Sequence, residues 1–289
     1  MVLLPLSTLL ENITGVYVPI TLGVTSYIYQ GTQVGLIGSS QFDPTMFASM
    51  LHQVAPHSLV LTPALLMALV KIAEHNPALV ASLRFVAVGG ASVAAQWIEH
   101  AHQLGIPVYE GYGLSECASV VCLNTPTQFK PGSCGKVLPH LELHIASDNE
   151  VWVKGNTALG YIDQPFNDEW YPTGDLADID EHGFVTLWGR KKNQIITSFG
   201  RNISPEWIET TAQKWLLGTP IVVVGDAQSC LTAVICSDKE MTSPIAKLNQ
   251  TLPDYAHINR VIYSAKSLSY PTSTPPMDAL FATNLNNGH

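Results

Sequence analysis

The sequence has few charged residues and no long uninterrupted hydrophobic run. Charged residues make up 13% of the 289 residues and hydrophobic ones 46%, and the mean hydropathy is +0.18. The longest apolar stretch near the start, residues 13–24, is broken by Gly15, Pro19 and Gly23, so it is too short to span a bilayer. No basic segment precedes it, which argues against a signal peptide. We therefore expect a globular chain without a transmembrane segment.

Positive charge and paired cysteines are also scarce. The sequence has 14 Lys and Arg against 23 Asp and Glu, a net charge of -9, and its one basic cluster is Arg190-Lys191-Lys192. Nucleic acid is therefore not expected as a partner. The 5 cysteines form an odd number without a C-x-x-C pair. This pattern predicts neither a disulfide framework nor a zinc site, and it favours a reduced, cytoplasmic setting.

Residues 109–116 concentrate groups that can contact a nucleotide. The stretch reads Tyr109-Glu110-Gly111-Tyr112-Gly113-Leu114-Ser115-Glu116 and follows a short apolar run at 106–108. Glycine lets the backbone approach a ligand. A ring can stack on a base, a hydroxyl can bond a phosphate oxygen, and a carboxylate can hold Mg²⁺. Taken alone, the same glycines could serve a tight turn and the same tyrosine could fill the core.

The first part of the chain alternates apolar runs with helical patterns. We expect strands at 27–29, 57–61, 83–88 and 107–109, and helices at 8–24, 43–54, 62–75 and 93–104. This order predicts an α/β fold with a parallel sheet flanked by helices. Ligands lie at the carboxyl ends of the strands in such sheets. The Gly89-Gly90-Ala91 turn and the loop 111–116 both follow strands, so both should face one crevice.

From residue 120 the pattern changes to short alternating runs separated by Gly, Pro, Asn and Asp. Runs at 142–146, 151–154 and 185–188 predict a small antiparallel β unit. Within it, Asp175 follows Gly174, a pairing that ordinarily marks an Asx-turn. From about residue 189 we expect a separate α+β domain, with strands at 195–197, 221–224, 231–236 and 260–263 and helices at 204–217 and 243–252. Residues 267–289, rich in Pro, Thr, Ser and Asn, should be loop or poorly ordered.

The motifs, taken in series, resemble those of the adenylate-forming (AMP-binding) superfamily. That group includes acyl-CoA synthetases, the adenylation domains of nonribosomal peptide synthetases, and luciferases. The opening Leu3-Leu4-Pro5-Leu6-Ser7 and the residues 191–196 resemble the long-chain fatty acid-CoA ligase branch. The series consists of Gly89-Gly90-Ala91, residues 111–116, Val151-Trp152-Val153-Lys154-Gly155, Leu159-Gly160-Tyr161, residues 171–176, residues 189–192 and residues 200–209.

The resemblance implies a two-part architecture. Residues 1–188 would be the remainder of the large AMP-binding domain, with an α/β part at 1–119 and a β-rich part at 120–188. Residues 189–289 would form a mobile α+β C-terminal domain, with a hinge near 190–192. The chain would lack the family's N-terminal subdomain, because it begins inside the Leu-Pro-Leu segment.

The resemblance also implies roles for the motif residues in nucleotide binding. Tyr112 would stack on adenine, Ser115 would bond the α-phosphate, and Glu116 would coordinate Mg²⁺. Asp175 would accept hydrogen bonds from the ribose hydroxyls, helped by Arg190. The floor of the adenine and acyl pocket, and the rest of the nucleotide-binding loop, would be Gly89, Gly90, Ala91, Glu110, Gly111 and Gly113.

Two further residues would serve the second half of the reaction. Lys192 stands at the hinge position, about which the small domain would swing between an adenylating and a thioester-forming pose. Gly200 matches the glycine that lets a pantetheine arm pass.

The implied activity is that of an AMP-forming acyl-CoA synthetase. A fatty acid or other carboxylate attacks ATP at the α-phosphate to give acyl-adenylate and pyrophosphate, and CoA or a carrier-protein pantetheine then takes the acyl group. Both steps depend on positioning and electrostatics.

The sequence also departs from the family pattern. The phosphate loop with its lysine is absent, the lysine near the C-terminus has no clear counterpart, and Thr8 replaces a gating His. We therefore expect this chain alone to be an incompetent or partial ligase. The alternatives are a non-catalytic adenylate-binding remnant or regulatory module, one half of a split ligase with a separate N-terminal half, and a fragment of an amino-acid adenylation domain.

Overall fold

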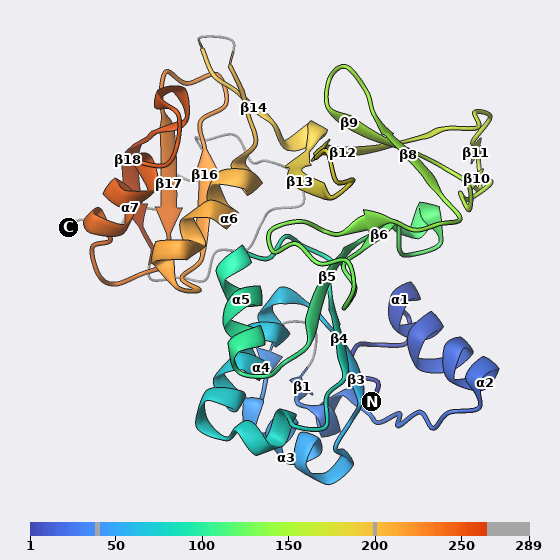
Figure 1. Ribbon diagram of the computed structural model, residues 1–289. Coiled ribbons are helices and arrows are strands. Elements are labelled where there is room, and N and C mark those ends of the chain that lie inside the picture. Colours follow the sequence, from blue (N-terminus) through green and yellow to red (C-terminus); the bar gives the residue numbers. More distant parts are fainter. Residues whose placement is uncertain (38–40, 199–200, 265–289) are drawn as a thin grey trace.

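The computed structural model describes residues 1–37, 41–198 and 201–264. Its buried hydrophobic side chains fall into clusters that follow one another along the chain. The first cluster runs from Leu3 to Val108, the next from Tyr112 to Val185, and the last from Ile195 to Ile258. Figure 1 shows these parts as an α/β body, a β unit above it on one side, and an α/β unit above it on the other.

The first cluster surrounds a mixed sheet. Strands β3 (Ser58–Leu61), β4 (Phe85–Val88) and β5 (Val108–Tyr112) are parallel, and β6 (Cys122–Leu123) and β7 (Lys136–Val137) continue the sheet in antiparallel pairing. Helices α3 (Pro44–Val54), α4 (Pro63–His75) and α5 (Ala95–Gln103) pack against it. This arrangement confirms the predicted parallel sheet flanked by helices.

Local sequence explains where α3 and α4 begin. Asp43 accepts hydrogen bonds from the backbone N–H groups of Thr45 and Met46, and proline follows it at the first helical position. Thr62 caps α4 in the same way, with its hydroxyl oxygen 3.4 Å from the N of Leu65. Both helix starts were therefore predictable from capping residues alone.

The chain enters through a helix and a short extended segment. We expected residues 8–24 to be a buried helix or helix pair. α1 (Leu9–Asn12), a π-helical turn (Ile13–Tyr17) and α2 (Val18–Leu22) form one continuous helix, but the expected burial is wrong for α2, none of whose residues is buried. The expected strand at 27–29 is wrong, because no described strand includes these residues. Aromatic and β-branched residues favour a strand only where a neighbouring strand pairs with them. A 3-10 turn (Gly31–Val34) and the short hairpin β1 (Leu36–Ile37) and β2 (Gln41–Phe42) follow.

The second cluster belongs to the predicted antiparallel unit. Its strand order is β13 (Val185–Arg190), β12 (Tyr171–Ile179), β9 (Glu150–Lys154) and β8 (Glu142–Ile145). The register pairs Asp175 on β12 with Arg190 on β13. A small hairpin of β10 (Gly160–Tyr161) and β11 (Gln164–Pro165) extends from this unit.

The third cluster holds an α/β unit. β16 (Ile221–Val224) is antiparallel to β17 (Leu231–Ile235), which is parallel to β18 (Ile258–Tyr263), and α6 (Pro205–Leu216) and α7 (Thr242–Asn249) pack against them. A 3-10 turn (Lys191–Asn193) and the hairpin β14 (Ile195–Ile196) and β15 (Asn202–Ile203) connect it to β13. The predicted tail at 267–289 lies outside the described residues. Among the described residues, no helix has both the length and the apolar character needed to cross a membrane.

Candidate nucleotide-binding site

The glycine turn and the tyrosine loop leave the sheet at the same edge. β4 and β5 are parallel neighbours, and their register pairs Val88 with Glu110. Gly89 lies so close to β5 that an added Cβ would be 3.0 Å from the carbonyl oxygen of Gly111. The expected convergence of these two segments is confirmed.

β5 is longer than the sequence suggested. We expected a strand at 107–109 followed by a loop, but Glu110, Gly111 and Tyr112 belong to the strand. Gly111 and Tyr112 pair with Leu123 and Cys122 of β6, and this pairing holds them extended. The motif thus begins inside the sheet, and only its second half is loop.

Tyr112, Asp175 and Arg190 form a polar cluster that joins the α/β body to the β unit; Tyr112 and Asp175 are buried, and Arg190 is exposed. The Tyr112 hydroxyl donates to Oδ2 of Asp175 over 2.6 Å, and Arg190 Nε lies 2.7 Å from Oδ1. Burial raises the pKa of Asp175, while the Tyr112 hydrogen bond and the Arg190 charge oppose that rise. Burial and then the negative charge of Asp175 raise the pKa of the Tyr112 hydroxyl, which keeps it a donor. Three residues named from separate motifs therefore meet in one place.

Glu110 is a second buried carboxyl at this edge. Its Oε1 accepts a hydrogen bond from the backbone N–H of Val93 over 3.2 Å. Burial raises the pKa of Glu110 to about 8, against the smaller opposing effect of that bond. At neutral pH the group is mostly protonated, so it can donate as well as accept a hydrogen bond.

Ser115 and Glu116 lie in a 3-10 turn (Ser115–Cys117) directly after the loop. Ser115 is exposed. The hydroxyl of Tyr161, on β10, donates to Oε1 of Glu116, and this bond is the main reason why the pKa of Tyr161 is raised. Tyr161 was part of a quoted motif, but its contact with Glu116 could not be foreseen, because the two residues are 45 positions apart.

Close packing explains why glycine occupies positions 111 and 113. A Cβ on Gly113 would overlap the carbonyl oxygen of Ser119, and one on Gly111 would crowd Leu123 and the carbonyl oxygen of Cys122. A Cβ on Gly90 would instead point into open space, where its φ of +85° favours glycine. Of these glycines, Gly90 leaves room for a ligand against the backbone.

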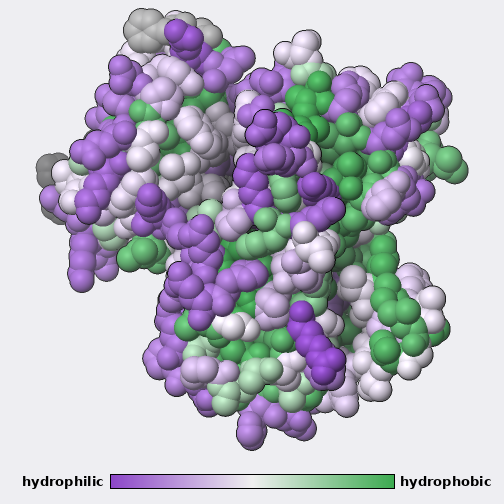
Figure 2. Space-filling view, viewed as in Figure 1, coloured by the Kyte–Doolittle hydropathy of each residue, from purple (hydrophilic) through white to green (hydrophobic). Residues whose placement is uncertain are grey.

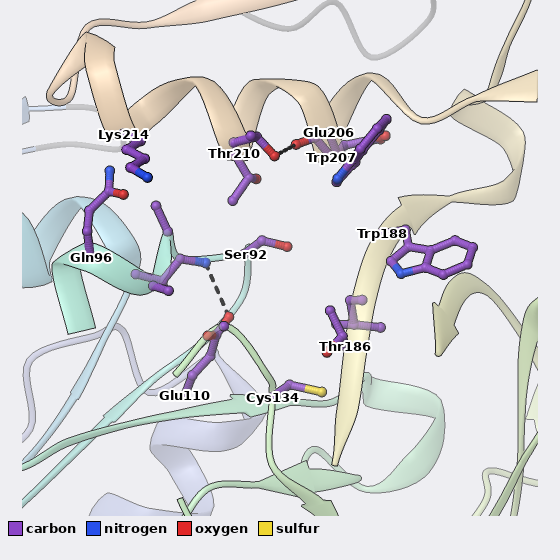
Figure 3. A pocket seen from close by; sticks show the side chains of 16 residues that line it. Ser92, Gln96, Glu110, Cys134, Thr186, Trp188, Glu206, Trp207, Thr210 and Lys214 are labelled. Carbon is purple, nitrogen blue, oxygen red and sulfur yellow. Dashed lines mark hydrogen bonds between the residues drawn. The ribbon is translucent and has the colours of Figure 1, made fainter. Parts of the chain in front are cut away.

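A cavity of about 280 Å³ opens between the sheet edge and α6. Figure 3 shows Glu110 and Ser92 on one side of it and Trp207, Thr210 and Lys214 of α6 on the other. Gln96 also lines the cavity, and its buried Nε2 has no hydrogen-bond partner among the described residues. A buried donor without a partner is rare in folded proteins. The cavity therefore has unused hydrogen-bonding capacity.

Trp207 lies partly in the core of its own unit and partly at the cavity. A tryptophan on an apolar helix face is ordinarily a core residue, and Trp207 does pack against the third cluster, but it is only partly buried and lines the cavity together with Trp188. Helical spacing showed that one face of α6 is apolar. It could not show that part of that face lies against the sheet edge of another unit.

The turn at Lys191–Asn193 contains one paired and one exposed lysine. Lys191 Nζ lies 2.7 Å from Oδ2 of Asp148 and 2.8 Å from Oε2 of Glu150, and Glu150 Oε1 accepts from the N–H of Gly174 over 3.0 Å. The Lys191 side chain therefore ties this turn to β9 and, through Glu150, to the backbone beside Asp175.

Two residues were expected to serve the second half of the reaction, Lys192 as the hinge and Gly200 in the path of the pantetheine arm. Lys192 is exposed at the surface of the turn. Gly200 lies outside the described residues.

Comparison with known families gives the class to which this α/β protein belongs. The family "AMP-binding enzyme" matches residues 1–162, more than half of the chain. This chain belongs to that family, as the resemblance predicted.

Two curated relatives show the extent of the sequence similarity. The long-chain-fatty-acid–CoA ligase FadD15 of Mycobacterium tuberculosis is 37% identical over 170 residues, which cover 56% of this chain and 28% of the relative. A 2-succinylbenzoate–CoA ligase of Staphylococcus aureus is 28% identical over 247 residues, which cover 79% of this chain and 49% of the relative. The chain thus spans between about a quarter and a half of the curated relatives it matches.

Solved structures confirm the fold. ATP-bound MatB from Rhodopseudomonas palustris superposes with a TM-score of 0.76 at 20% identity, covering 98% of this chain and 59% of that one. O-succinylbenzoate coenzyme A synthetase (MenE) from Bacillus subtilis, in complex with ATP and magnesium ion, gives 0.74 at 22% identity, covering 92% and 57%. At these identities the likeness concerns the fold alone.

Proposed function

We propose that residues 1–289 form the adenylate-binding part of an AMP-forming acyl-CoA ligase. The observation that carries this proposal is the cluster of Tyr112, Asp175 and Arg190, in a chain of the AMP-binding family whose Gly89 lies against Gly111, the neighbour of Tyr112. The separate motif residues meet only in the folded protein. The cluster offers a ring, a carboxylate and a guanidinium at the edge where α/β sheets bind ligands.

In this proposal each member of the cluster has one task. The ring of Tyr112 faces the adenine base, and the open space at Gly90 accommodates it. Asp175 accepts hydrogen bonds from the ribose hydroxyls, with its carboxylate oriented by Arg190 Nε and by the Tyr112 hydroxyl. Ring stacking on a base contributes roughly 1 to 3 kcal/mol where it has been measured. Glu110, protonated at neutral pH, can donate to a ring nitrogen of the base.

The turn at Ser115–Cys117 would bind the phosphates of the nucleotide. Ser115 is exposed and free to bond an α-phosphate oxygen. Glu116 supplies carboxylate oxygen, the donor that Mg²⁺ prefers, and Tyr161 holds that carboxylate through Oε1. Bound Mg²⁺ would offset the charge that develops on the phosphate oxygens. The remaining work is positioning, so the reaction requires no protein nucleophile.

The proposed substrates are a fatty acid or other carboxylate, ATP, and CoA or a carrier-protein pantetheine. The printed names of the relatives, which are CoA ligases of fatty acids and of 2-succinylbenzoate, support CoA as acceptor and a carboxylic acid as donor. They favour this assignment over amino-acid adenylation.

We also propose a boundary between a large part, residues 1–188, and a small domain, residues 189–289. Within the large part, residues 1–119 would be the α/β part and 120–188 the β-rich part, and the hinge would lie at 190–192. The separate hydrophobic clusters on either side of the Lys191–Asn193 turn support this division. Lys192 would be the hinge residue, and Gly200 would line the path of the pantetheine arm.

We propose further that the 289-residue chain does not complete the reaction unaided, since it covers at most 59% of the solved ligases named above. Exchange of labelled pyrophosphate into ATP in the presence of a fatty acid tests this point. We expect exchange at the level of the assay without enzyme, while a full-length fatty-acid ligase gives a strong signal under the same conditions. Robust exchange that depends on the carboxylate would show that the chain alone is competent and would overturn the proposal.

A further inference from the structure

The strand β12 bulges away from its neighbour β9 just before Asp175. The register of the two strands shifts between Pro172 and Leu176. Gly174 lies inside this bulge with a φ of +72°, a conformation that favours glycine. A bulge re-aims side chains out of the regular alternation of a strand, and bulges are frequent beside active sites. The direction of the Asp175 side chain therefore depends on how the bulge at 173–175 is held.

On the side of β9, side chains hold the bulge in place of the strand ladder. The N–H of Gly174 donates to Oε1 of Glu150 over 3.0 Å. The N–H of Asp175 donates to the hydroxyl oxygen of Thr173 over 3.1 Å, and that hydroxyl donates to the carbonyl oxygen of Val151 over 2.9 Å. A segment that leaves a ladder needs such substitutes for its lost backbone bonds. Glu150 thus fixes the residue directly before Asp175.

Glu150 is itself held by a cation. Lys191 Nζ lies 2.8 Å from Oε2 of Glu150 and 2.7 Å from Oδ2 of Asp148. The Glu150 side chain is 10% exposed and that of Lys191 is 46% exposed. A buried carboxylate that loses its cation keeps an uncompensated charge, which disfavours its buried position. Lys191 therefore stabilises Glu150 where it accepts the hydrogen bond from Gly174.

The same lysine offsets a negative charge that acts on Asp175. Burial is the main cause of the raised pKa of Asp175, and the charges of Glu116 and Glu150 add to that rise. A cation bound to Glu150 reduces the effect of its charge on Asp175. Lys191 thus favours the ionised form of Asp175, which accepts hydrogen bonds through both oxygens.

We propose that Lys191 is a positioning residue for the ribose-binding carboxylate of Asp175, acting through Glu150 and the bulge at 173–175. This inference rests on the proposed adenylate site, in which Asp175 accepts from the ribose hydroxyls. Because its effect passes through Asp175, Lys191 should influence recognition of those hydroxyls and not of the base or the phosphate. Lys191 also belongs to the turn at the proposed hinge, so the ribose site depends on where that turn lies.

Titration with two nucleotides tests the proposal on the 289-residue chain. AMP carries both ribose hydroxyls and 2′,3′-dideoxy-AMP carries neither, so the ratio of their affinities measures what the hydroxyls contribute. Wild type should bind AMP about tenfold to a hundredfold more tightly. Lys191→Met should weaken AMP binding about threefold to tenfold and leave the affinity for 2′,3′-dideoxy-AMP unchanged. A general structural disturbance would weaken both nucleotides alike.

Lys130→Met is the matched control. Lys130 Nζ lies 2.6 Å from Oδ2 of Asp180, and the Lys130 side chain is 49% exposed. Asp180 accepts from the backbone N–H groups of His182 and Phe184, in a turn that follows β12. Lys130→Met therefore removes a similar ion pair from the same unit, and it should bind both nucleotides as wild type does.

Lys191→Arg tests whether the charge and the hydrogen bonds are responsible. Arginine keeps the charge and can donate to both Glu150 and Asp148, so this variant should recover most of the preference for AMP. Figure 2 shows hydrophilic surface over β13, the strand that leads into the turn of Lys191. Substitution of an exposed lysine in this turn should leave the core intact, and equal thermal unfolding of the variants verifies this.

Amide hydrogen exchange provides a measurement that requires no nucleotide. The N–H of Gly174 should exchange at least about threefold faster in Lys191→Met than in wild type, because its acceptor is less firmly held. In Lys130→Met the exchange of Gly174 should be unchanged.

The outcomes separate this inference from the proposed function. Where Asp175→Asn weakens AMP binding, three results would overturn the role of Lys191 alone and leave the adenylate site standing. They are equal AMP affinity in wild type and Lys191→Met, equal weakening of both nucleotides in Lys191→Met, and unchanged exchange at Gly174. Undetectable binding of AMP by the wild type would overturn the proposed function and this inference together.

Discussion

The hydroxyl of Tyr112 and the carboxylate of Asp175 meet where β5 faces β12, and both are buried. In Tyr112→Phe, the carboxylate would keep Arg190 and lose its hydroxyl donor. We expect the free energy of unfolding at pH 7 to fall by about 1 to 3 kcal/mol, the usual cost of leaving a buried polar group underbonded. Urea unfolding measures this.

Tyr109→Phe is the control for that substitution. Tyr109 is a buried tyrosine of the same strand, and its ring packs on Phe85 and Phe129. This variant should unfold close to wild type. Equal losses in the two variants would mean that the hydrogen bond to Asp175 contributes nothing.

The buried carboxyl of Glu11 should make the free energy of unfolding depend on pH. Burial raises the pKa of Glu11 to about 7, against an opposing hydrogen bond from the N–H of Leu3. The folded state favours the protonated form of Glu11. The contribution of Glu11 to stability is therefore complete below its pKa in the unfolded chain, near 4.5, and is lost as the pH rises through its pKa in the folded protein, about 7.

Glu11→Gln should therefore be more stable than wild type at pH 8.5, by roughly 1 to 3 kcal/mol at about 1.4 kcal/mol per pKa unit. At pH 4 the two proteins should differ little. Denaturant midpoints at both pH values provide the measurement, and Glu99→Gln, on the exposed side of α5, is the control. A wild type as stable as Glu11→Gln at pH 8.5 would contradict the assignment.

At the scale of single residues, the sequence motifs identified the residues of the candidate site but not the contacts between them. Tyr112, Asp175 and Arg190 were identified individually, since each stands in a short pattern. The link from Lys191 through Glu150 to Gly174 was missed, because Lys191 and Glu150 are 41 positions apart and neither belongs to a motif that couples them. Contacts of that kind depend on strand register, which the local sequence does not define.

Among the elements, the turn after β5 depends on Gly113. A Cβ at this position would overlap the carbonyl oxygen of Ser119, so Gly113→Ala would force the backbone apart. We expect a loss of about 3 kcal/mol or more in the free energy of unfolding, as for other overpacked sites. Thermal or urea unfolding measures it.

Gly31→Ala is the comparison for Gly113→Ala. A Cβ on Gly31 would meet its nearest atom, the Cβ of Leu36, at an ordinary 3.5 Å. That variant should be nearly neutral. A Gly113→Ala protein as stable as Gly31→Ala would show that the turn can adjust, and that its close packing does not select glycine.

Helices were predicted better than strand ends. α3, α4 and α6 begin where a capping residue precedes proline, because capping is a local interaction. β5 extends past its predicted end since β6 pairs with it, and the segment 27–29 is not a strand since no described strand pairs with it. Both errors arise from pairing, which is not local.

At the scale of the whole molecule, the order of the motifs predicted the fold class and the family, and both are confirmed. The cavity beside Glu110 was beyond prediction, because it requires α6 to lie against the edge of a sheet formed about 100 residues earlier in the chain. The exposure of α2 was missed for a related reason. An apolar sequence predicts burial, and only the fold shows that the described residues leave these side chains exposed.

The most direct test of the adenylate site is a calorimetric titration of AMP into the 289-residue chain, into Asp175→Asn, and into Asp178→Asn, whose exposed carboxylate lies on the same strand. Wild type and Asp178→Asn should bind one AMP with equal affinity. Asp175→Asn should bind about tenfold to a hundredfold more weakly, the equivalent of one or two charge-assisted hydrogen bonds. Undetectable AMP binding by the wild type, or equal affinity in Asp175→Asn, would contradict the account.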